Sequence, residues 1–332
     1  MKDKEALLEI KNLSIGIRRG KKLLSAVEDV SFNIGKGEIL GIVGESGAGK
    51  TLTALSIPGL LGEEMELSSG SIFFLGRNLL KLSEKELAAV RGKEISMIFQ
   101  EPFASLNPLQ KAGVQIRETA ELHGEKDRAK IDKQVMELMQ KLRFTEPEKV
   151  LDTYPHRLSG GMCQRVMIAL AIICRPKLLI ADEPTTALDK NTQSQIISLL
   201  KEINFSLGTS ILFISHDLEL IKSIAHRVLV MYSGRILEAG DSDEIFSNPS
   251  HEYTRGLLNS IPDRTKKGKD LAAIPGKIPS LEEGRPEGCP FHPRCEKARQ
   301  ECRETFPPAR SVSGRETGTA VHTSHCVLKG LE

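Results

Sequence analysis

A glycine-rich loop is the first place where this sequence could do chemistry. Residues 44–51 read GESGAGKT and match the pattern G-x-x-x-x-G-K-[ST]. In such a loop the glycines let successive backbone N–H groups face one anion, and the helix that follows presents the positive end of its dipole to the same anion. Lys50 supplies a positive charge to the phosphate oxygens, and the hydroxyl of Thr51 is a ligand for Mg²⁺. The loop therefore predicts a site for the β- and γ-phosphates of a nucleotide. The residues expected to line it are Gly44, Glu45, Ser46, Gly47, Ala48, Gly49, Lys50, Thr51 and Leu52.

An acidic pair follows a second apolar run. The segment 178–184 reads LLIADEP, so Asp182 and Glu183 come at the end of an expected buried strand. A carboxylate at the carboxyl edge of a strand, beside a phosphate loop, can hold Mg²⁺ through water. The adjacent Glu183 is placed to polarise an attacking water. Taken alone, Asp182 and Glu183 could equally be a surface acidic pair that follows a buried strand. The phosphate loop in the same chain favours the catalytic interpretation.

Short apolar runs indicate the elements that must position these groups. Continuous apolar segments rich in β-branched residues predict buried parallel strands at 37–44, 95–99, 178–182 and 211–215. The stretch from about 105 to 175 is rich in Leu, Met, Glu and Lys and predicts helices. Further strands are expected at 7–17, 23–34 and 226–240, the last with a Ser-Gly turn, and the run RRGKK at 18–22 is expected to be a solvated hairpin tip. Strands that alternate with helices indicate an α/β core with a helical insert.

Composition limits the possible functions. The chain has 332 residues, 39% of them hydrophobic, and a formal net charge of +2. This balance gives no electrostatic reason to expect nucleic acid as a partner. No apolar run reaches the roughly 18 residues of a membrane span, and the charged start MKDKEALLEI lacks the apolar region of a signal peptide. We therefore expect a cytosolic chain that reaches a membrane only through partners.

The last part of the chain differs in composition from the rest. From about residue 260 it is rich in Pro, Gly and charge, and four of the six cysteines lie in it with the spacing C-x5-C-x6-C-x23-C. In a reducing compartment such a cluster indicates metal ligation over disulfides. Four thiolates suit an iron–sulfur cluster or Zn²⁺; the absence of C-x2-C pairs favours the cluster, and free thiols are the third possibility. The expected ligands are Cys289, Cys295, Cys302 and Cys326, with His292, His322 and His325 as possible substitutes. Cys163 and Cys174 are interpreted as small buried residues.

The order of the motifs resembles the nucleotide-binding domain of ABC ATPases. After the phosphate loop come Gln100, the segment LSGGM at 158–162, the LLIADE segment, ALD at 187–189 and His216, in the order and spacing of that family. The resemblance implies a P-loop ABC nucleotide-binding domain with a RecA-like mixed sheet core, an antiparallel β subdomain and an α-helical subdomain. The implied limits are 6–257 for this ATPase domain, with the helical part at about 101–177, and 258–332 for a loop-rich extension with the four cysteines.

The same resemblance implies roles for individual residues. Gln100 would sense the γ-phosphate and Mg²⁺, Glu183 would be the general base, and His216 would contact the γ-phosphate and hold the attacking water. Ser159, Gly160 and Gly161 would donate hydrogen bonds to ATP bound on the opposite monomer, and Asp189 would link the two sites across the dimer. Mg²⁺ would be held by Thr51, Gln100 and Asp182. In two places the chain departs from the family: Ile17 stands where an adenine-stacking aromatic is usual, and Met162 stands where Gln is commoner.

Three segments narrow the resemblance to one group of importers. The sequences FQEPFASLNP (99–108), LSGGMCQRVMIALAI (158–172) and IPGKIPSLEEGRPEGCPFHPRCEKARQEC (274–302) are similar to ATPases of the dipeptide, oligopeptide and nickel importers. Some members of that group carry a [4Fe–4S] cluster in the extension. The resemblance, which covers about residues 6–328, implies ATP-driven uptake of dipeptides or oligopeptides, or alternatively of nickel or a metallophore. A non-transport ABC ATPase of DNA repair or translation is the alternative from another class.

The implied partners are two transmembrane permease subunits, an extracytoplasmic substrate-binding protein and a second, related ATPase subunit, with a homodimer also possible. The implied place is the cytoplasmic face of the inner membrane, as a peripheral protein. The implied cofactors are ATP, Mg²⁺ and the [4Fe–4S] cluster, or zinc in place of the cluster.

Overall fold

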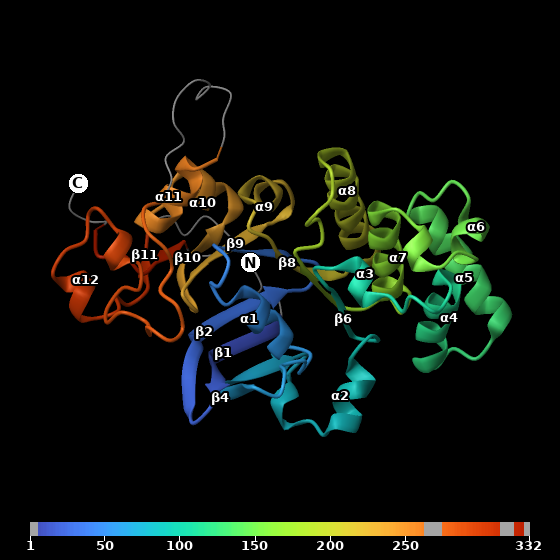
Figure 1. Cartoon of the computed structure of the whole chain (residues 1–332), viewed down its shortest axis with the longest axis horizontal. Coiled ribbons are helices and arrows are strands. Elements are labelled where there is room, and N and C mark those ends of the chain that lie inside the picture. Colours follow the sequence, from blue (N-terminus) through green and yellow to red (C-terminus); the bar gives the residue numbers. More distant parts are fainter. Residues whose placement is uncertain (1–5, 262–273, 313–321, 329–332) are drawn as a thin grey trace. The chain divides into compact units, whose positions relative to one another are not determined.

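The chain folds into two structural units whose segments alternate along the sequence (Figure 1). The computed structural model describes residues 6–261, 274–312 and 322–328. The first unit contains 34–38 and 75–213, with the start of the chain up to Leu7. The second contains 8–33, 39–74 and the chain from Ile214 onward. Each unit is described by itself, because the site residues are divided between them.

Three neighbouring strands form the sheet of the first unit, in the order β8-β7-β6. They are β6 (Ile95–Ile98), β7 (Leu178–Asp182) and β8 (Ser210–Ile214). β6 and β7 run parallel, with Ile95 opposite Leu178, and every residue of β7 and β8 is buried. Strands buried on both faces are mostly apolar, and the three strands predicted here are confirmed.

Helices make up the rest of the first unit, as the composition of 105–175 predicted. The long ones are α4 (Ala112–Leu122), α5 (Arg128–Lys141), α7 (Gly160–Ile172) and α8 (Lys190–Leu207). The short elements are β5 (Arg77–Asn78), η1 (Leu79–Lys81), α2 (Glu84–Val90), α3 (Pro102–Ser105), α6 (Pro147–Leu151) and η2 (Pro155–Arg157). α4 packs against α5, α6 and α7, and α7 packs against β6. Side-chain caps fix where helices begin: Asp127 accepts hydrogen bonds at the start of α5, and Asp189 does so at the start of α8.

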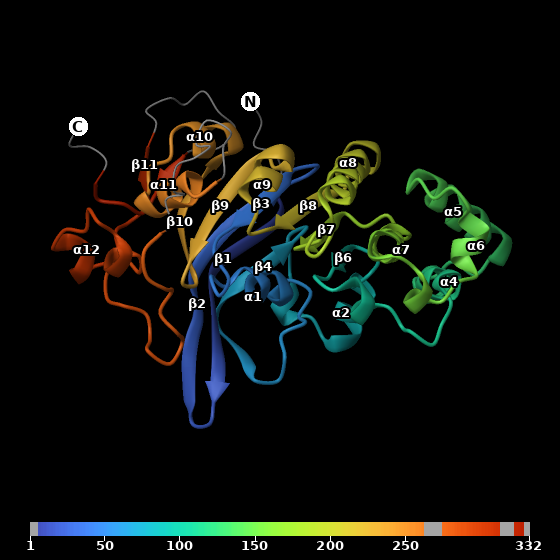
Figure 2. The same cartoon turned by 45° about the horizontal axis from the view of Figure 1, so that its top comes forward.

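The second unit contains an antiparallel sheet with the strand order β2-β1-β4. Its members are β1 (Ala6–Arg19), β2 (Lys22–Gly35) and β4 (Met65–Phe74), and Leu8 of β1 lies opposite Phe74 of β4. Figure 2 shows β1 and β2 as one long hairpin in blue. Its tip at Gly20 and Lys21 is exposed, which confirms the interpretation of RRGKK as a solvated turn.

A second sheet in this unit carries the phosphate loop. Its order is β11-β12-β10-β9-β3. The strands are β3 (Ile39–Val43), β9 (Arg227–Tyr232), β10 (Arg235–Asp241), β11 (Arg310–Ser311) and β12 (Thr323–Ser324). β3 and β9 are parallel, whereas β9–β10, β10–β12 and β11–β12 are antiparallel. The helices are α1 (Lys50–Ser56), α9 (Leu218–Ile224), α10 (Ser242–Ser247) and α11 (Glu252–Asn259).

The C-terminal segment is mostly loop where it is described, as predicted, with η4 (His292–Arg294) and α12 (Glu301–Glu304) as its short helices. Sequence reasoning interpreted its cysteines as the means of holding a segment too polar to pack alone. The structure adds another attachment, because β12 extends the sheet at β10 and Phe291 is only 3% exposed. Within the described ranges, no helix has both the length and the apolar character needed to cross a membrane.

Candidate functional site

The phosphate loop lies between β3 and α1, and its backbone requires glycine. Gly49 adopts φ +96 directly before α1, a left-handed conformation that disfavours other residues. A Cβ on Gly44 would lie 2.1 Å from the carbonyl oxygen of Met231, so only glycine fits beside β9. The side chain of Lys50 is buried, and its Nζ donates to the carbonyl oxygens of Gly44 at 2.7 Å and Glu45 at 3.0 Å. The backbone of the loop thus holds the ammonium group of its own lysine.

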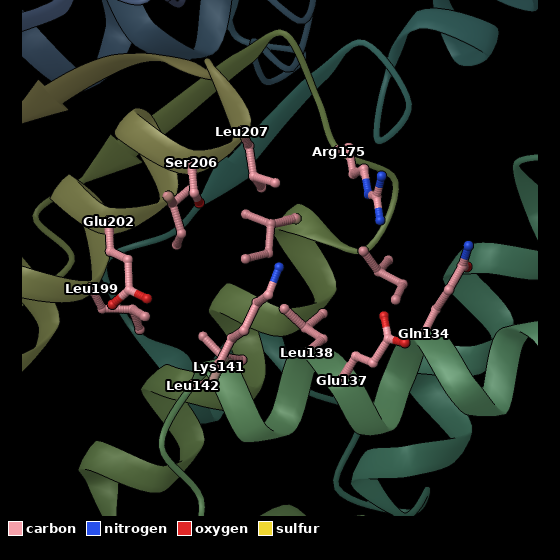
Figure 3. A pocket seen from close by; sticks show the side chains of 13 residues that line it. Gln134, Glu137, Leu138, Lys141, Leu142, Arg175, Leu199, Glu202, Ser206 and Leu207 are labelled. Carbon is pink, nitrogen blue, oxygen red and sulfur yellow. The ribbon is translucent and has the colours of Figure 1, made fainter.

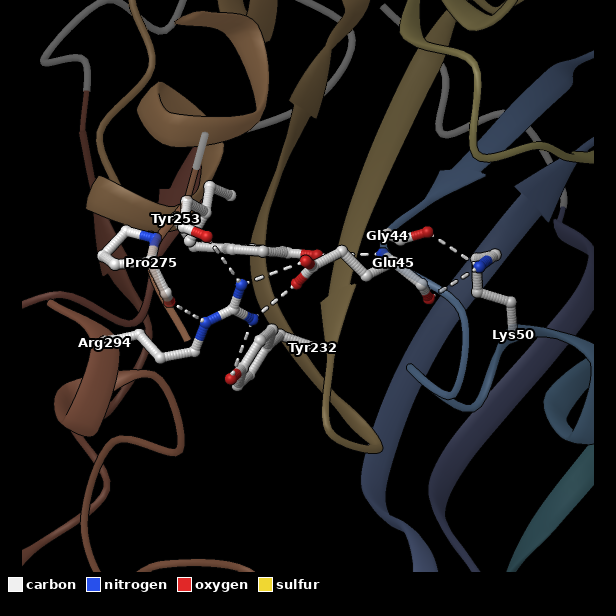
Figure 4. A network of polar contacts seen from close by, with 8 residues as sticks. Gly44, Glu45, Lys50, Tyr232, Tyr253, Pro275 and Arg294 are labelled. Carbon is white, nitrogen blue, oxygen red and sulfur yellow. Dashed lines mark hydrogen bonds and ion pairs between the residues drawn. The ribbon is translucent and has the colours of Figure 1, made fainter. Parts of the chain in front are cut away.

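Residues far along the chain hold this loop from outside (Figure 4). The backbone N–H of Glu45 donates to the hydroxyl of Tyr253 at 2.9 Å, and the Glu45 carboxylate forms an ion pair with Arg294 at 2.7 Å. The backbone N–H of Gly234 donates to the carbonyl of Ala48 at 2.9 Å. Sequence reasoning missed Tyr253 and Arg294. Only a weak signal for Arg294 was present in the sequence. It stands beside Cys295 in a Pro-Arg-Cys segment, and that segment was interpreted only through its cysteine.

The acidic pair lies in the first unit, where the structure brings Glu183 and Gln100 together. Asp182 ends β7 and is buried, whereas Glu183 is half-buried and adopts φ +46. A non-glycine residue in this region stores backbone strain, which is common at functional sites. Oε2 of Glu183 accepts hydrogen bonds from Oγ1 of Thr186 at 2.8 Å and from Nε2 of Gln100 at 3.3 Å. The carboxylate is therefore oriented by two neighbours.

The LSGGM segment begins helix α7. Oγ of Ser159 accepts a hydrogen bond from the Met162 N–H at 3.3 Å and caps the helix, while the exposed Ser159 stays open to solvent on its other sides. A Cβ on Gly161 would lie 2.7 Å from Cγ2 of Thr192, whereas one on Gly160 meets nothing closer than 3.7 Å. Only at Gly161 does a close approach require glycine.

The same Thr192 connects the LSGGM segment with Asp189. The hydroxyl of Thr192 donates to Oδ2 of Asp189 at 2.6 Å, and Oδ1 of Asp189 accepts from the N–H groups of Asn191 and Thr192 at 3.0 Å. These hydrogen bonds, first that from the Thr192 side chain, lower the pKa of Asp189. Through Thr192, the structure thus connects Asp189 with Gly161 of the LSGGM segment, inside the first unit.

The remaining predicted residues lie in the second unit with the phosphate loop. His216 is exposed directly after β8 and precedes Asp217, whose side chain caps α9. Ile17 lies on β1 opposite Met65 of β4 and is half-buried. Thr51 is exposed at the start of α1, and Leu52 is half-buried after it. The predicted site residues are thus gathered into two groups, one in each unit.

The four C-terminal cysteines line one small cavity in the second unit. His251, His292 and His325 line it as well, and Sγ of Cys289 lies 3.7 Å from Nε2 of His251. His322 has another role, since its Nε2 is 2.7 Å from Oε1 of the buried Glu238. Within the ranges that the structure describes, no group of three or more His, Cys, Asp and Glu side chains is arranged so that it could hold a metal ion.

Burial raises the pKa of three of these thiols. It raises the pKa of Cys289 to about 12 and also raises the pKa values of Cys295 and Cys326. As free thiols they would stay protonated near neutral pH and would be poor nucleophiles. Cys163 is buried in the first unit, where its Sγ lies 3.3 Å from the Pro155 carbonyl and burial raises its pKa to about 11. The structural interpretation of Cys163 is therefore supported.

A larger pocket lies in the first unit between α5, the end of α7 and α8 (Figure 3). Leucines from α5 and α8 form much of its wall, and the charged side chains of Lys141 and Glu202 line it as well. It contains none of the residues predicted to bind nucleotide. The predicted chemistry is therefore not located in this pocket.

Comparisons with known proteins agree with both parts of the chain. The model of a family described as ABC transporter matches residues 27–186, and the model of the oligopeptide/dipeptide transporter C-terminal region matches residues 237–302. The chain is 45% identical over 306 residues to a probable peptide ABC transporter ATP-binding protein of Sinorhizobium fredii, covering 91% of each chain. It is 44% identical to the oligopeptide transport ATP-binding protein OppD of Escherichia coli, covering 94% of this chain and 92% of the relative. It is 42% identical to the dipeptide transport ATP-binding protein DppD of the same organism, covering 94% and 95%.

Solved structures show the same fold. The dimeric structure of the bacterial ABC transporter cassette MJ0796 superimposes with a TM-score of 0.64 at 26% identity, covering 71% of this chain and 98% of that one. A structure of cbiO1 from Clostridium perfringens, part of the ABC transporter complex cbiONQ, also gives a TM-score of 0.64, at 27% identity. The fold class predicted from the motifs is therefore confirmed. With its phosphate loop, acidic pair and LSGGM segment, the chain is an ATPase that belongs to the family of ABC transporter ATP-binding proteins, in the group with the oligopeptide/dipeptide transporter C-terminal region.

Proposed function

We propose that this chain is the ATP-hydrolysing subunit that powers the uptake of dipeptides or oligopeptides. The observation that carries the proposal is the presence, in one chain, of a complete phosphate loop and of the C-terminal region found in oligopeptide and dipeptide transporters. The three relatives described above are all named for peptides, and their match runs through the ATPase domain and the extension. This full-length match favours transport over a role in DNA repair or translation.

In the proposed mechanism the phosphate loop binds ATP, and the acidic pair of Asp182 and Glu183 takes part in its hydrolysis. Backbone N–H groups of residues 44–51 and the ammonium of Lys50 hold the β- and γ-phosphates of ATP. Thr51 and Asp182 offer hard oxygen ligands of the kind that Mg²⁺ prefers, and Gln100 is the third proposed ligand. Bound Mg²⁺ would neutralise charge on the phosphate oxygens. Glu183, oriented by Thr186 and Gln100, takes the proton of the attacking water.

The remaining roles belong to the dimer. Ser159, Gly160 and Gly161, at the start of α7, donate to ATP held by the other subunit, because a helix N-terminus with open N–H groups favours an anion. His216 holds the attacking water against the γ-phosphate, and Asp189 couples the two sites. Binding of two ATP molecules closes the dimer and hydrolysis opens it, which is a shift of population between two states.

The proposed partners follow from the same transport role. They are two permease subunits in the membrane, a second and related ATPase subunit, and an extracytoplasmic binding protein that delivers the peptide. The chain would act as a peripheral protein at the cytoplasmic face of the inner membrane. The proposed domain division is an ATPase domain at 6–257, with a helical part at about 101–177, and an extension at 258–332.

Uptake and hydrolysis measured together test this function. Cells that lack the gene should fail to take up a radiolabelled tripeptide, and wild-type protein should restore uptake. Glu183→Gln should be produced at the same level and restore nothing, which separates loss of hydrolysis from loss of the complex. Restored uptake of labelled nickel in place of peptide would reject the peptide assignment, and peptide uptake by the Glu183→Gln strain would reject the role of Glu183.

A [4Fe–4S] cluster in the extension is the cofactor that we propose besides ATP and Mg²⁺. Cys289, Cys295, Cys302 and Cys326 all line one cavity, and this shared position supports the proposal. Cluster binding would require deprotonated thiols, so it would release protons from these buried cysteines. When bound, a cluster would cross-link segments that are far apart in sequence.

Metal analysis after anaerobic purification tests the cofactor. About four irons and four sulfides per chain would support the cluster, zinc alone would support the zinc alternative, and no metal would support free thiols. Cys289→Ser with Cys295→Ser should remove the metal. Cys163→Ser with Cys174→Ser is the matched control and should leave the metal content unchanged.

A further inference from the structure

Arg294 joins the C-terminal segment to the phosphate loop through a buried fork of hydrogen bonds (Figure 4). Its Nη1 donates to Oε2 of Glu45 at 2.7 Å and its Nη2 donates to Oε1 at 3.1 Å. Its Nε donates to the carbonyl of Pro275 at 2.7 Å, and Nη1 also reaches the hydroxyl of Tyr232 at 3.3 Å. The side chain of Arg294 is only 5% exposed. A bidentate arginine–carboxylate pair of this kind fixes both partners in direction as well as in distance.

The partner of Arg294 is an acidic residue inside a loop that must bind a polyanion. Glu45 is the second residue of the GESGAGKT segment, and it is the one acidic residue within it. A carboxylate close to phosphate groups repels them unless a cation compensates its charge. Arg294 supplies that cation from the C-terminal segment and holds the carboxylate toward itself (Figure 4).

The backbone of Glu45 carries the effect to the catalytic lysine. Its carbonyl accepts a hydrogen bond from Nζ of Lys50 at 3.0 Å, and its N–H donates to the hydroxyl of Tyr253 at 2.9 Å. Tyr253 packs edge to face against Tyr232, with ring centroids 4.7 Å apart, and Tyr232 packs likewise against Phe291 at 5.4 Å. Any movement of Glu45 would therefore shift the loop around Lys50.

A second arginine of the C-terminal segment supports the same loop independently. Nε of Arg285 donates to the carbonyl of Ser233 at 2.6 Å, and Arg285 also forms an ion pair with Glu28. The N–H of the next residue, Gly234, donates to the carbonyl of Ala48 in the loop at 2.9 Å. The segment 274–312 thus touches the phosphate loop directly through Arg294 and indirectly through the turn at Ser233 and Gly234.

We propose that Arg294 is a positioning residue for the phosphate loop, and that through it the C-terminal segment sets the affinity of the chain for ATP. This inference rests on the proposed ATPase function. Arg294 compensates the charge of Glu45 and keeps the loop in its binding conformation, and it does not touch the reacting atoms. Its loss weakens nucleotide binding and leaves the rate at saturating ATP nearly unchanged.

The test is a double-mutant comparison with the purified full chain. The dissociation constant of a fluorescent ATP analogue, and KM and kcat for ATP, are measured for wild type, Arg294→Met, Glu45→Gln and the double variant. Arg294→Met should weaken ATP binding about tenfold, since it leaves the half-buried carboxylate of Glu45 uncompensated in the loop that binds the phosphates. Glu45→Gln should restore binding in the Arg294→Met background to within about threefold of wild type, because no charge is then left to compensate.

Arg255→Met is the matched control. Arg255 lies in the same unit, is partly buried, forms an ion pair with Glu252 at 2.8 Å and donates to the carbonyl of Pro249. Its substitution removes a similar side chain and should leave ATP affinity unchanged. Equal weakening by Arg255→Met would show a general effect of loosening the unit and would overturn the proposal.

Two other results would also overturn it. The first is a folded Arg294→Met protein that binds ATP as tightly as wild type. The second is a double variant that binds as weakly as Arg294→Met, because Arg294 would then not act through Glu45. If Arg294→Met fails to fold, Arg294→Lys decides: a single ammonium should give intermediate weakening of about threefold, and unchanged affinity rejects the proposal. Failure of the ATPase function would give a different result from failure of the role of Arg294, because the wild-type chain itself would then neither bind nor hydrolyse ATP.

Discussion

The two groups of predicted site residues are supported in different ways. The phosphate loop in the second unit is held by buried partners that lie far along the chain, Tyr253 being 208 residues and Arg294 249 residues from Glu45. In the first unit, the half-buried Glu183 is held by Thr186, only three residues away, and by the exposed Gln100. The binding loop is therefore held by buried tertiary partners, whereas the side-chain contacts given above for the half-buried Glu183 include one from within its own turn.

This difference fits the different tasks of the two groups. A loop that binds phosphate gains affinity from donors already in place, since no ordering cost remains when the nucleotide arrives. A base that acts only when ATP is bound must change its contacts during the cycle, and a half-buried side chain can do so at a smaller cost than a fully buried one. The positive φ of Glu183 adds strain that the surrounding turn must maintain. Substitutions in the two groups should therefore differ in what they change.

The largest effect is expected at Glu183. Glu183→Gln keeps the shape and the hydrogen bond from Thr186 but removes the base, so hydrolysis should fall about 10²- to 10⁴-fold. ATP binding should persist, because the loop that binds it lies in the other unit. Phosphate release and equilibrium binding of ATP measure the two separately. Glu202→Gln, on α8 of the same unit, is the control and should hydrolyse ATP as wild type does; if Glu183→Gln hydrolyses equally well, the division into binding and acting groups is wrong.

The next largest effect is expected on the stability of the LSGGM segment. Gly161→Ala should lower the free energy of unfolding by about 1–3 kcal/mol, because the new Cβ would lie 2.7 Å from Cγ2 of Thr192. Thr192→Ser removes that methyl group but keeps the hydroxyl that binds Asp189, so it should recover most of the loss in the double variant. Gly160→Ala, with 3.7 Å to its nearest neighbour, should cost much less. Thermal or urea unfolding measures all three, and equal losses for the two alanine variants would contradict the steric explanation.

The buried strands and the local motifs could be predicted from the sequence for a physical reason. Residues 178–181 and 211–214 are apolar throughout because both faces of their strands are buried, and the GESGAGKT pattern is contained in eight consecutive residues. The Glu45–Arg294 pair joins residues 249 positions apart, and no local pattern encodes such a pair. Strand β12 has two residues, Thr323 and Ser324, too few to show any periodicity. The attachment of the C-terminal segment was thus beyond what spacing and composition predict.

A buried carboxylate in the second unit tests that attachment. Glu238 is fully buried and accepts hydrogen bonds from the N–H groups of Ser250 at 2.5 Å and His251 at 2.9 Å, besides its contact with His322. Burial alone would raise the pKa of Glu238, but these hydrogen bonds outweigh it and leave the pKa lowered. A lowered folded-state pKa gives stability that is present above the unfolded value of about 4.3 and is lost as the pH falls through the folded-state pKa.

Glu238→Gln should therefore destabilise the protein by about 1–2 kcal/mol at pH 7 and reduce the acid dependence of its stability. Glu244→Gln is the control, because Glu244 faces the same His322 at 3.6 Å but is 43% exposed. Urea unfolding at pH 7 and pH 4.5 measures both variants. A loss as large in Glu244→Gln would show that the ion pair with His322 matters and that burial of the carboxylate does not.

The smallest effect is expected as a gain of affinity at Ile17. The ABC family resemblance places an adenine-stacking aromatic at this position of β1, and the half-buried Ile17 offers only apolar contact. Ile17→Tyr should tighten ATP binding by about 0.5–1.5 kcal/mol, the typical value of an aromatic stacking contact, and tyrosine is well tolerated in strands. Since stacking is the same in the bound and reacting states, KM should fall while kcat stays unchanged. Arg18→Tyr is the matched control, because the next residue of a strand points to the opposite face and should leave affinity unchanged. If both variants bind ATP equally well, adenine does not lie against Ile17. If Ile17→Tyr instead changes kcat, then ATP binding and hydrolysis are not assigned separately to the phosphate loop and to the group around Glu183.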